Sequence, residues 1–278
     1  MTTKSSRVCV ITGAAGVLCS TFARALAQDG WQLALLDLNG DAAQRLAGEI
    51  NASGGTAYGY AANVLDRAAL EKVHAAVGAD LGPAALLING AGGNNPKATT
   101  AKEYFTPGDE ADADLCTFFD LNEAGFDFVF DLNLKGTLLP TQVFAADMIG
   151  REGCAIVNIS SMNAFRPLTK IPAYSAAKSA VSNFTQWLAV HFAGAGIRVN
   201  AIAPGFFVTA QNRALLFDED GTPTPRTGKI LAATPMGRFG KPEELLGTLR
   251  WLIDAEAASF VTGIVVPVDG GFSAYSGV

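Results

Sequence analysis

Three side chains that could move a proton stand near one another in the middle of the chain. Tyr174 and Lys178 are four positions apart in a segment with helical periodicity, so both face the same side of the helix. A neighbouring ammonium favours the phenolate and lowers the pKa of a tyrosine from about 10 toward the working range. Ser161 precedes Tyr174 by 13 residues at the end of a strand-like run, and its hydroxyl can bond the same substrate oxygen. The pattern predicts acid–base chemistry at a secondary alcohol or a ketone.

The prediction depends on this combination of residues. A tyrosine and a lysine four positions apart also occur as an ordinary solvent-facing pair in many helices. The upstream serine and a glycine-rich turn near the start of the chain make the pattern specific. Ser160 is the alternative for the serine role, and the spacing to Tyr174 favours Ser161.

The glycine-rich turn lies between the first apolar run and the first helix-like segment. Residues 12–16 read Thr-Gly-Ala-Ala-Gly, and small residues let the backbone approach a pyrophosphate at the amino end of a helix. Asp37 ends the second strand-like run, where a carboxylate can accept both hydroxyls of an adenosine ribose and repels a 2′-phosphate. Ala14, Ala15 and Leu38 supply no cation there, so we expect NAD rather than NADP. The alternatives are an ordinary strand–helix turn and a solvated aspartate.

Short apolar runs alternate with helix-periodic segments along the chain. The runs expected to be strands are residues 8–11, 33–36, 57–60, 86–88, 155–159, 198–202 and 264–267. The segments expected to be helical are residues 17–28, 41–50, 68–77 and 172–192. Because the runs are apolar without alternation, they predict strands buried on both faces, as in a parallel sheet. We therefore expect one α/β domain over residues 1–278, with a doubly wound parallel sheet flanked by helices on both faces.

Two long polar stretches interrupt this order, at about residues 94–120 and 209–235. Connections of this length in a single domain are typical of lids and binding loops. We expect both stretches to be loop insertions that cover the site.

The composition restricts the classes of function. The chain has 278 residues, of which 49% are hydrophobic and 17% are charged, with a net charge of −6. A mildly acidic chain without a cluster of basic residues is a poor candidate for binding nucleic acid or an anionic membrane. The four cysteines have no metal-ligand spacing, and His74 and His191 have no ligand-spaced partner, so we expect no metal. The sequence shows no signal peptide and no apolar run of spanning length, which favours a cytoplasmic protein with reduced thiols.

These features together resemble the short-chain dehydrogenase/reductase family. The matching stretches extend from residue 8 to residue 269 and comprise residues 12–16, Asp37, residues 89–92, Asn133, residues 159–161, residues 174–178 and residues 204–205. The resemblance implies a Rossmann-like fold and an NAD(H)-dependent oxidoreductase. It assigns the general acid/base role to Tyr174 and polarisation of the substrate oxygen to Ser161. It also implies that Lys178 binds the nicotinamide ribose and that Asn133 supports a proton relay.

The same resemblance implies which residues surround the dinucleotide. They are Thr12, Gly13, Ala15, Gly16, Val17, Leu18, Asp37, Leu38, Asn63, Val64, Asn89, Gly90, Ala91, Gly92, Tyr174, Lys178, Pro204, Gly205, Val208 and Thr209. Val17 and Cys19 depart from the family, because they occupy positions where it has glycines. Cys19 is either a partly activated thiol at a helix start or a buried, inert side chain. Asn63 replaces an acidic residue of the family, which implies weaker contact with adenine.

Polar side chains around the expected chemistry favour a polar, anionic substrate. The candidates are Asn94, Asn163, Arg166, Asn212 and Arg213, and an arginine can bind a carboxylate through two hydrogen bonds. Each is equally open to being a solvated loop residue. Residues 89–96, 126–135, 161–167 and 204–212 resemble the D-mannonate oxidoreductase (fructuronate reductase) branch of the family. That resemblance implies interconversion of D-mannonate and D-fructuronate, and other polyols and sugar acids, including gluconate-type substrates, stay open.

Two competing functions remain at this point. The first is the same chemistry on an unrelated ketone, such as a steroid-like substrate, against which the polar loops argue. The second is a non-enzymatic dinucleotide-binding module, against which the complete set of Ser161, Tyr174 and Lys178 argues. The resemblance further implies a homo-oligomer, either a tetramer or a dimer.

Overall fold

The computed structural model describes residues 7–208 and 213–277, and a parallel sheet forms its centre. Within these ranges seven strands follow the order β3-β2-β1-β4-β5-β6-β7, and every neighbouring pair is parallel. All seven expected strands are present, and the doubly wound sheet is confirmed. The strands are β1 Val8–Thr12, β2 Gln32–Asp37, β3 Thr56–Ala61, β4 Ala84–Asn89, β5 Ala155–Ile159, β6 Arg198–Pro204 and β7 Val265–Val268.

The helices include several that the sequence did not predict. The described helices are α1 Val17–Gln28, α2 Gly40–Ala52, α3 Arg67–Asp80, α4 Glu123–Phe130, α5 Gly136–Phe144, α6 Pro172–Phe192, α7 Arg213–Leu216, α8 Pro225–Ala232 and α9 Leu246–Ile253. The stretch of residues 209–235, expected as a loop insertion, contains α7 and α8 within its described part. Helix α8 begins at Pro225, and the Thr224 hydroxyl before it accepts a hydrogen bond of 3.3 Å from the Thr227 backbone N–H.

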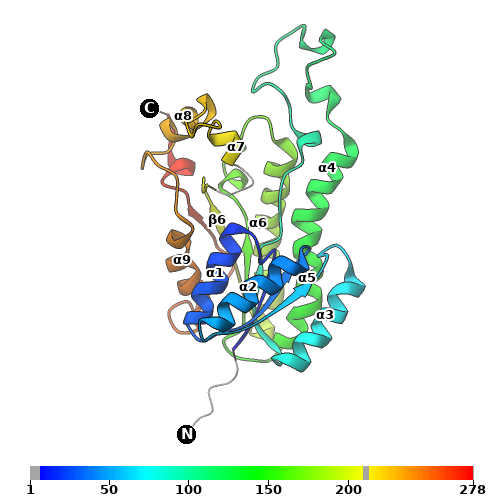
Figure 1. Ribbon diagram of the computed structural model, residues 1–278, viewed down its shortest axis with the longest axis vertical. Coiled ribbons are helices and arrows are strands. Elements are labelled where there is room, and N and C mark those ends of the chain that lie inside the picture. Colours follow the sequence, from blue (N-terminus) through cyan, green and yellow to red (C-terminus); the bar gives the residue numbers. More distant parts are fainter. Residues whose placement is uncertain (1–6, 209–212, 278) are drawn as a thin grey trace.

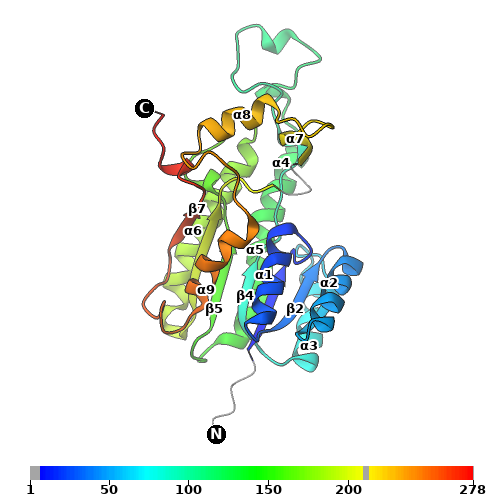
Figure 2. The same ribbon diagram turned by 60° about the vertical axis from the view of Figure 1, so that its left-hand side comes forward.

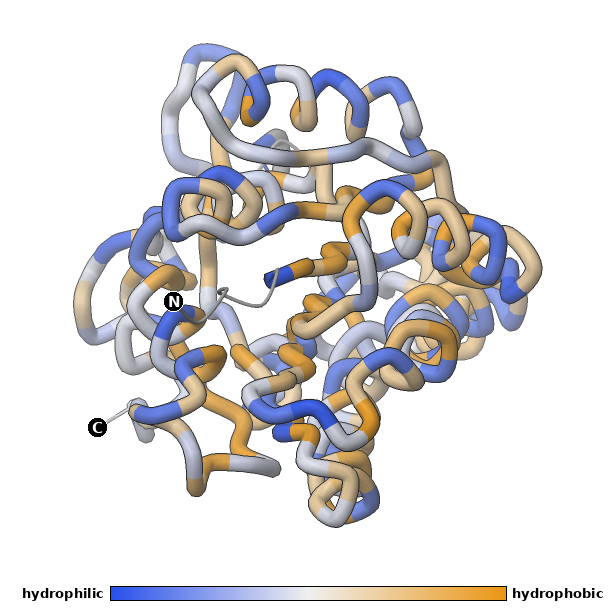
Figure 3. Tube along the Cα trace, turned by 90° about the horizontal axis from the view of Figure 1, so that it is seen from below, coloured by the Kyte–Doolittle hydropathy of each residue, from blue (hydrophilic) through white to orange (hydrophobic). Residues whose placement is uncertain are grey.

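Helices cover both faces of the sheet (Figures 1 and 2). On one face the buried side chains of α1, α2 and α9 share a core with the strands, and on the other face those of α3, α5 and α6 do so. The hydropathy colouring shows the apolar residues gathered along the strands and the inner sides of the helices (Figure 3). The unbroken apolar runs form strands because both of their faces are covered in this way: every residue of β1 and β5 is buried.

The carboxyl ends of the strands meet at one edge of the sheet. There β1 pairs with β4 on one side and with β2 on the other, which makes the gap between β1 and β4 the topological switch point. The polar stretch that follows β4, together with α7 and α8, lies at this end of the molecule (Figures 1 and 2). None of the helices in the described ranges has the length and hydrophobicity needed to cross a bilayer.

Candidate active site

The turn after β1 requires glycine at its second position. Gly13 has φ +63°, and a Cβ atom there would come within 2.8 Å of the Ala91 Cα atom and 2.9 Å of the Ala91 backbone nitrogen. Thr12 fixes the same approach from the other side, because its hydroxyl accepts hydrogen bonds from the backbone N–H groups of Gly90 (3.1 Å) and Ala91 (3.3 Å). The loops after β1 and β4 therefore form one rigid backbone cradle at the start of α1, which fits a pyrophosphate group.

Asp37 lies beside this cradle. Its Oδ2 atom accepts a hydrogen bond of 3.0 Å from the Ala15 backbone N–H, and its Oδ1 atom accepts one of 2.9 Å from Asn39. The half-buried carboxylate is thus held at the carboxyl end of β2 while keeping further acceptor capacity. Leu38 next to it is 78% exposed and brings no charge. The arrangement fits two ribose hydroxyls and repels a phosphate ester at this point.

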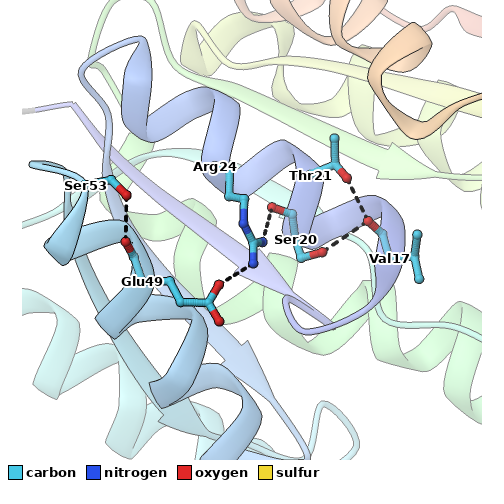
Figure 4. Close-up of polar contacts among 6 residues, drawn as sticks. All are labelled: Val17, Ser20, Thr21, Arg24, Glu49 and Ser53. Carbon is cyan, nitrogen blue, oxygen red and sulfur yellow. Dashed lines mark hydrogen bonds and ion pairs between the residues drawn. The ribbon is translucent and has the colours of Figure 1, made fainter. Parts of the chain in front are cut away.

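The opening turn of helix α1 is closed by local hydrogen bonds to Val17. The Val17 carbonyl accepts hydrogen bonds from the Ser20 hydroxyl (3.2 Å) and the Thr21 hydroxyl (3.0 Å), as Figure 4 shows. The same view shows Arg24 of α1 paired with Glu49 of α2, which joins the two helices. The backbone N–H groups at the helix start remain directed toward the turn.

Cys19 is a buried, inert side chain. It is 4% exposed, and its Sγ atom would lie 2.1 Å from a Cβ atom built on Gly90. Burial and the nearby carboxylate of Asp37 raise the pKa of its thiol to about 12, against a smaller lowering effect of Lys178. The alternative of an activated thiol is wrong, since that role requires a lowered pKa. Cys19 instead fills the space that Gly90 leaves open.

The remaining expected cofactor residues lie around the same edge. The Asn63 side-chain oxygen accepts a hydrogen bond of 3.0 Å from the Leu65 backbone, so it shapes the turn after β3 as well. Val64 is buried against Gly136, and a Cβ atom on Gly205 would come within 2.5 Å of the Asp269 Cα atom. The other positions are Gly16 and Leu18 at the start of α1, Pro204 at the end of β6, and Val208 beyond it. Thr209 lies outside the described residues.

Lys178 stands at the centre of the expected acid–base group. It is 4% exposed, and its Nζ atom donates a hydrogen bond of 2.8 Å to the Ile159 carbonyl at the end of β5. The same Nζ atom lies 5.7 Å from the centroid of the Tyr174 ring. Desolvation lowers the pKa of the ammonium from 10.5 to about 8. The lysine is therefore still charged at neutral pH, and burying that charge destabilises the folded state.

The pKa of the Tyr174 phenol differs from what the sequence predicted. Burial raises its pKa above the ordinary value, and a hydrogen bond with Ser161 opposes that rise. The expected lowering of this pKa by Lys178 is not present in the chain alone, because the lysine donates to a backbone carbonyl instead of to the phenol. Tyr174 is accordingly a protonated group, ready to donate a proton.

The structure distinguishes the two serines. The Ser160 hydroxyl is buried against α6, where it bonds the Lys178 carbonyl (3.1 Å) and the Ser182 hydroxyl (2.7 Å). The Ser161 hydroxyl accepts a hydrogen bond of 3.2 Å from the Asn163 backbone N–H and is joined to the Tyr174 phenol. Only Ser161 shares the phenol's surroundings, so it is the candidate catalytic serine.

Asn133 reaches the site through an irregular helix. It belongs to a π-helical segment, Asp131–Lys135, between α4 and α5, and such segments often occur at functional sites. The side chain is fully buried, and its amide nitrogen donates to the carbonyls of Val129 (2.7 Å) and Gly93 (2.8 Å). A Cβ atom on Gly92 would lie 2.7 Å from the Asn133 Oδ1 atom and 3.0 Å from the Lys178 Nζ atom. The two polar groups therefore flank the same glycine.

A buried polar network supports this centre; the sequence pointed to Asn89 in it but not to Thr141, Asn158 and Thr185. The Asn89 amide donates to Thr141 Oγ1 (3.0 Å) and Asn158 Oδ1 (2.8 Å), and the Asn158 amide donates to Thr185 Oγ1 (2.9 Å). These bonds tie β4 and β5 to α5 and α6, the helices that follow Asn133 and carry Tyr174. The sequence signal for this network is Asn158, an asparagine within the otherwise apolar strand β5.

The candidate substrate residues separate into two groups. Asn94 and Asn163 carry buried side-chain oxygens without a hydrogen-bond partner. Arg166 is exposed and donates a hydrogen bond of 3.1 Å to the Ser273 carbonyl, which commits it to the C-terminal segment. Arg213 is exposed and lies over the Phe217 ring at 5.7 Å. Asn212 lies outside the described residues.

The histidines and the acidic side chains show no arrangement for a metal. His74 pairs with Asp147 at 2.8 Å, and His191 stacks on Trp187 with ring centroids 4.6 Å apart. Across residues 7–208 and 213–277, no three His, Cys, Asp or Glu side chains gather as a possible metal site. The described groups therefore point to acid–base chemistry beside a dinucleotide cradle.

Comparison with known proteins agrees with this geometry. The family model for short chain dehydrogenases matches residues 7–220. A solved structure of a provisionally assigned D-mannonate oxidoreductase from Haemophilus influenza, with bound NAD, is 59% identical, has a TM-score of 0.95, and covers 99% of this chain and 97% of its own. The uncharacterised oxidoreductase UxuB of Bacillus subtilis is 53% identical over 99% of this chain and 97% of its own length. A gluconate 5-dehydrogenase structure from Burkholderia cenocepacia, in complex with NADP and tartrate, is 29% identical with a TM-score of 0.81, covering 98% and 97% of the two chains. By its sequence match and its fold, the chain belongs to the short-chain dehydrogenase family.

Proposed function

We propose that the chain is an NAD(H)-dependent oxidoreductase that interconverts a secondary alcohol and a ketone of a sugar acid. The substrate pair that we propose is D-mannonate and D-fructuronate. The observation that carries the proposal is the grouping of Ser161, Tyr174, Lys178 and Asn133 beside the cradle formed by the loops after β1 and β4. The similar Haemophilus structure, with its bound NAD, supports both the cofactor and the substrate class.

The cofactor residues fit a dinucleotide without a 2′-phosphate. Gly13, Gly90 and Thr12 hold the two loops close enough for backbone N–H groups to face a pyrophosphate. Asp37 offers acceptors to the ribose hydroxyls and repels an added phosphate. When bound, the nicotinamide supplies or accepts the hydride.

The side chains of this chain supply the proton and hold the reacting oxygen. In the reducing direction Tyr174, whose pKa is raised, gives its phenolic proton to the ketone oxygen as negative charge develops there. Ser161 accepts the Asn163 N–H and shares a hydrogen bond with Tyr174, which places its hydroxyl beside the same oxygen. In the oxidising direction the phenolate of Tyr174 is the base that accepts the proton of the alcohol. Lys178 lies 5.7 Å from the ring centroid and against Gly92 of the loop after β4, where it would hold the nicotinamide ribose.

The proposed anionic polyol agrees with the polar groups at the carboxyl edge. Asn94 and Asn163 offer unpartnered acceptors, which suit hydroxyl groups and do not suit a steroid-like ketone. Lys170, Arg226 and Lys229 all act on the Glu103 carboxylate and lower its pKa, and Lys229 contacts it at 2.8 Å. This cluster supplies positive charge to an end of the molecule that an anionic substrate must approach. Gluconate-type substrates remain the alternative, favoured by the similarity to the gluconate 5-dehydrogenase.

We also propose that the chain forms a homo-oligomer. Large apolar side chains are exposed on α6 and after α9, including Trp187 (56%), Val190 (80%) and Phe260 (103%). Exposed apolar groups of this kind are typical of protein interfaces. Light scattering of the purified protein measures the number of copies.

A substrate panel tests the proposed function. NADH oxidation is followed with D-fructuronate, D-tagaturonate and 5-ketogluconate, and NAD reduction with the corresponding sugar acids. We expect the highest kcat/KM for the D-fructuronate and D-mannonate pair. Turnover of none of these compounds, by an enzyme that binds NADH, contradicts the proposal.

A further inference from the structure

Within the described ranges, three asparagine side chains at the carboxyl edge of the sheet have buried oxygens without a hydrogen-bond partner. Asn89 is the last residue of β4, and its amide nitrogen is bonded within the core, whereas Asn94 and Asn163 lie in the loops beyond the strands. Asn94 follows β4 and Asn163 follows β5, the neighbouring strand. The Oδ1 atoms of both are buried and have no hydrogen-bond partner. Buried polar side-chain atoms in folded proteins are nearly always bonded, because leaving one unpaired costs free energy. Two such acceptors in adjacent loops point to a ligand that completes them.

The orientation of the Asn94 amide follows from its neighbours. The Thr99 hydroxyl donates its one proton to the Asn95 carbonyl at 3.0 Å. Thr99 Oγ1 can therefore only accept from Asn94, which lies 3.1 Å away, so the amide nitrogen of Asn94 must face it. The amide oxygen is consequently the end of Asn94 that lacks a partner.

Asn163 lies directly beside the reacting group. Its residue is 3% exposed, and its backbone N–H donates to Ser161 Oγ at 3.2 Å. The buried side-chain oxygen of Asn163 has no hydrogen-bond partner among the described residues. A buried amide left open two residues from the candidate catalytic serine is placed to contact the substrate close to the reacting carbon.

We propose that Asn94 and Asn163 select the substrate through its hydroxyl groups, each accepting a hydrogen bond from one hydroxyl that does not react. The substrate class is then a polyol chain that carries at least two hydroxyls besides the one oxidised. An amide oxygen can only accept, so a methylene group leaves it unpaired and a carboxylate repels it. The inference rests on the proposed oxidoreductase function and adds which groups of the substrate these two residues bind.

The test combines enzyme variants with deoxy substrates. Wild type, Asn163→Leu and Asn94→Leu are assayed with a sugar acid that wild type turns over and with its monodeoxy derivatives. We expect the kcat/KM of wild type to be about 10- to 100-fold lower for the derivative that lacks the hydroxyl bound by Asn163. Without that hydroxyl the buried amide oxygen has no hydrogen-bond donor. Asn163→Leu should treat that pair of substrates alike within about 3-fold. Asn94→Leu should do the same for a different hydroxyl.

Three controls keep the test decisive. Gln44→Leu removes an exposed amide from α2 and should retain the full wild-type discrimination. Thr99→Val removes the group that orients Asn94 and should weaken discrimination at the Asn94 hydroxyl alone. If Asn163→Leu fails to fold, Asn163→Asp replaces it; this variant keeps an acceptor and should still discriminate between neutral polyols.

The outcomes separate this inference from the proposed function. If wild type oxidises neutral polyols such as mannitol and no sugar acid, the sugar-acid proposal fails, and the hydroxyl test is run on those polyols and their deoxy derivatives. Equal kcat/KM values for parent and every deoxy derivative in wild type overturn the inference. Discrimination that persists unchanged in both leucine variants overturns it as well.

Discussion

Replacing Lys178 by methionine separates the cost of burying its charge from its contribution to the chemistry. The ammonium is 4% exposed, and its pKa is lowered from 10.5 to about 8. Since a pKa change of one corresponds to about 1.4 kcal/mol, the charged lysine destabilises the fold by about 3 kcal/mol at pH 7. The hydrogen bond to the Ile159 carbonyl returns about 1.5–3 kcal/mol, so Lys178→Met should be equal to wild type or up to about 2 kcal/mol more stable at that pH.

The pH dependence gives the sharper measurement. Between pH 8 and pH 10.5 the unfolded chain holds the proton of Lys178 and the folded chain releases it, so wild-type stability rises with pH in that window. The charged lysine destabilises the folded state fully below pH 8, and this destabilisation decreases as the pH rises above 8. From pH 7 to pH 9.5 wild type should gain about 2 kcal/mol relative to Lys178→Met.

Urea unfolding without cofactor measures this change. Free energies of unfolding are compared for wild type and Lys178→Met at pH 7 and pH 9.5. Lys72→Met, at an exposed lysine of α3, is the matched control, and its difference from wild type should not follow this pH dependence. A difference between wild type and Lys178→Met that stays constant within about 0.5 kcal/mol would refute the argument that the ammonium is desolvated. The same variant should lose kcat by about 100-fold or more, because the ammonium no longer holds the nicotinamide ribose in place beside Tyr174.

Three further substitutions test the other parts of the site. Tyr174→Phe should lower kcat by about 10²- to 10⁴-fold while the fluorescence titration of NADH stays unchanged, and near-normal turnover would reject the acid–base role. Asp37→Ser should lower the ratio of kcat/KM for NADH over NADPH by about 10-fold or more, since it removes the repulsion of a 2′-phosphate; a constant ratio would contradict the role of this carboxylate. Gly13→Ala should destabilise the fold by at least about 1–2 kcal/mol from the left-handed backbone alone, and the contact with Ala91 should weaken NADH binding further; wild-type affinity and melting temperature would contradict the close approach.

The sequence by itself determined the sheet and the types of residue at its edge. Unbroken apolar runs bounded by turn residues favour buried strands, so the strands could be predicted from residues 8–11 to residues 264–267, although β3 and β7 are only partly buried. Glycine at position 13 and the spacing from Tyr174 to Lys178 are local properties, and they place the turn and the acid–base pair without knowledge of the rest. By contrast, α8 and α9 are short, and their helical patterns are too brief to distinguish from loops.

Only the tertiary structure decided which polar groups act together. The sequence could not assign the Ser160 hydroxyl to α6, because its partner Ser182 is distant along the chain. Sequence spacing also overstated the effect of Lys178 on Tyr174: burial depresses the pKa of the lysine and raises that of the phenol, and burial is set by the packing of the whole domain. The unsatisfied oxygen of Asn163 is likewise visible only when every neighbour is in place. Residue types and short spacings therefore follow from local rules, whereas solvation and hydrogen-bond partnership depend on contacts between segments that are far apart in the chain.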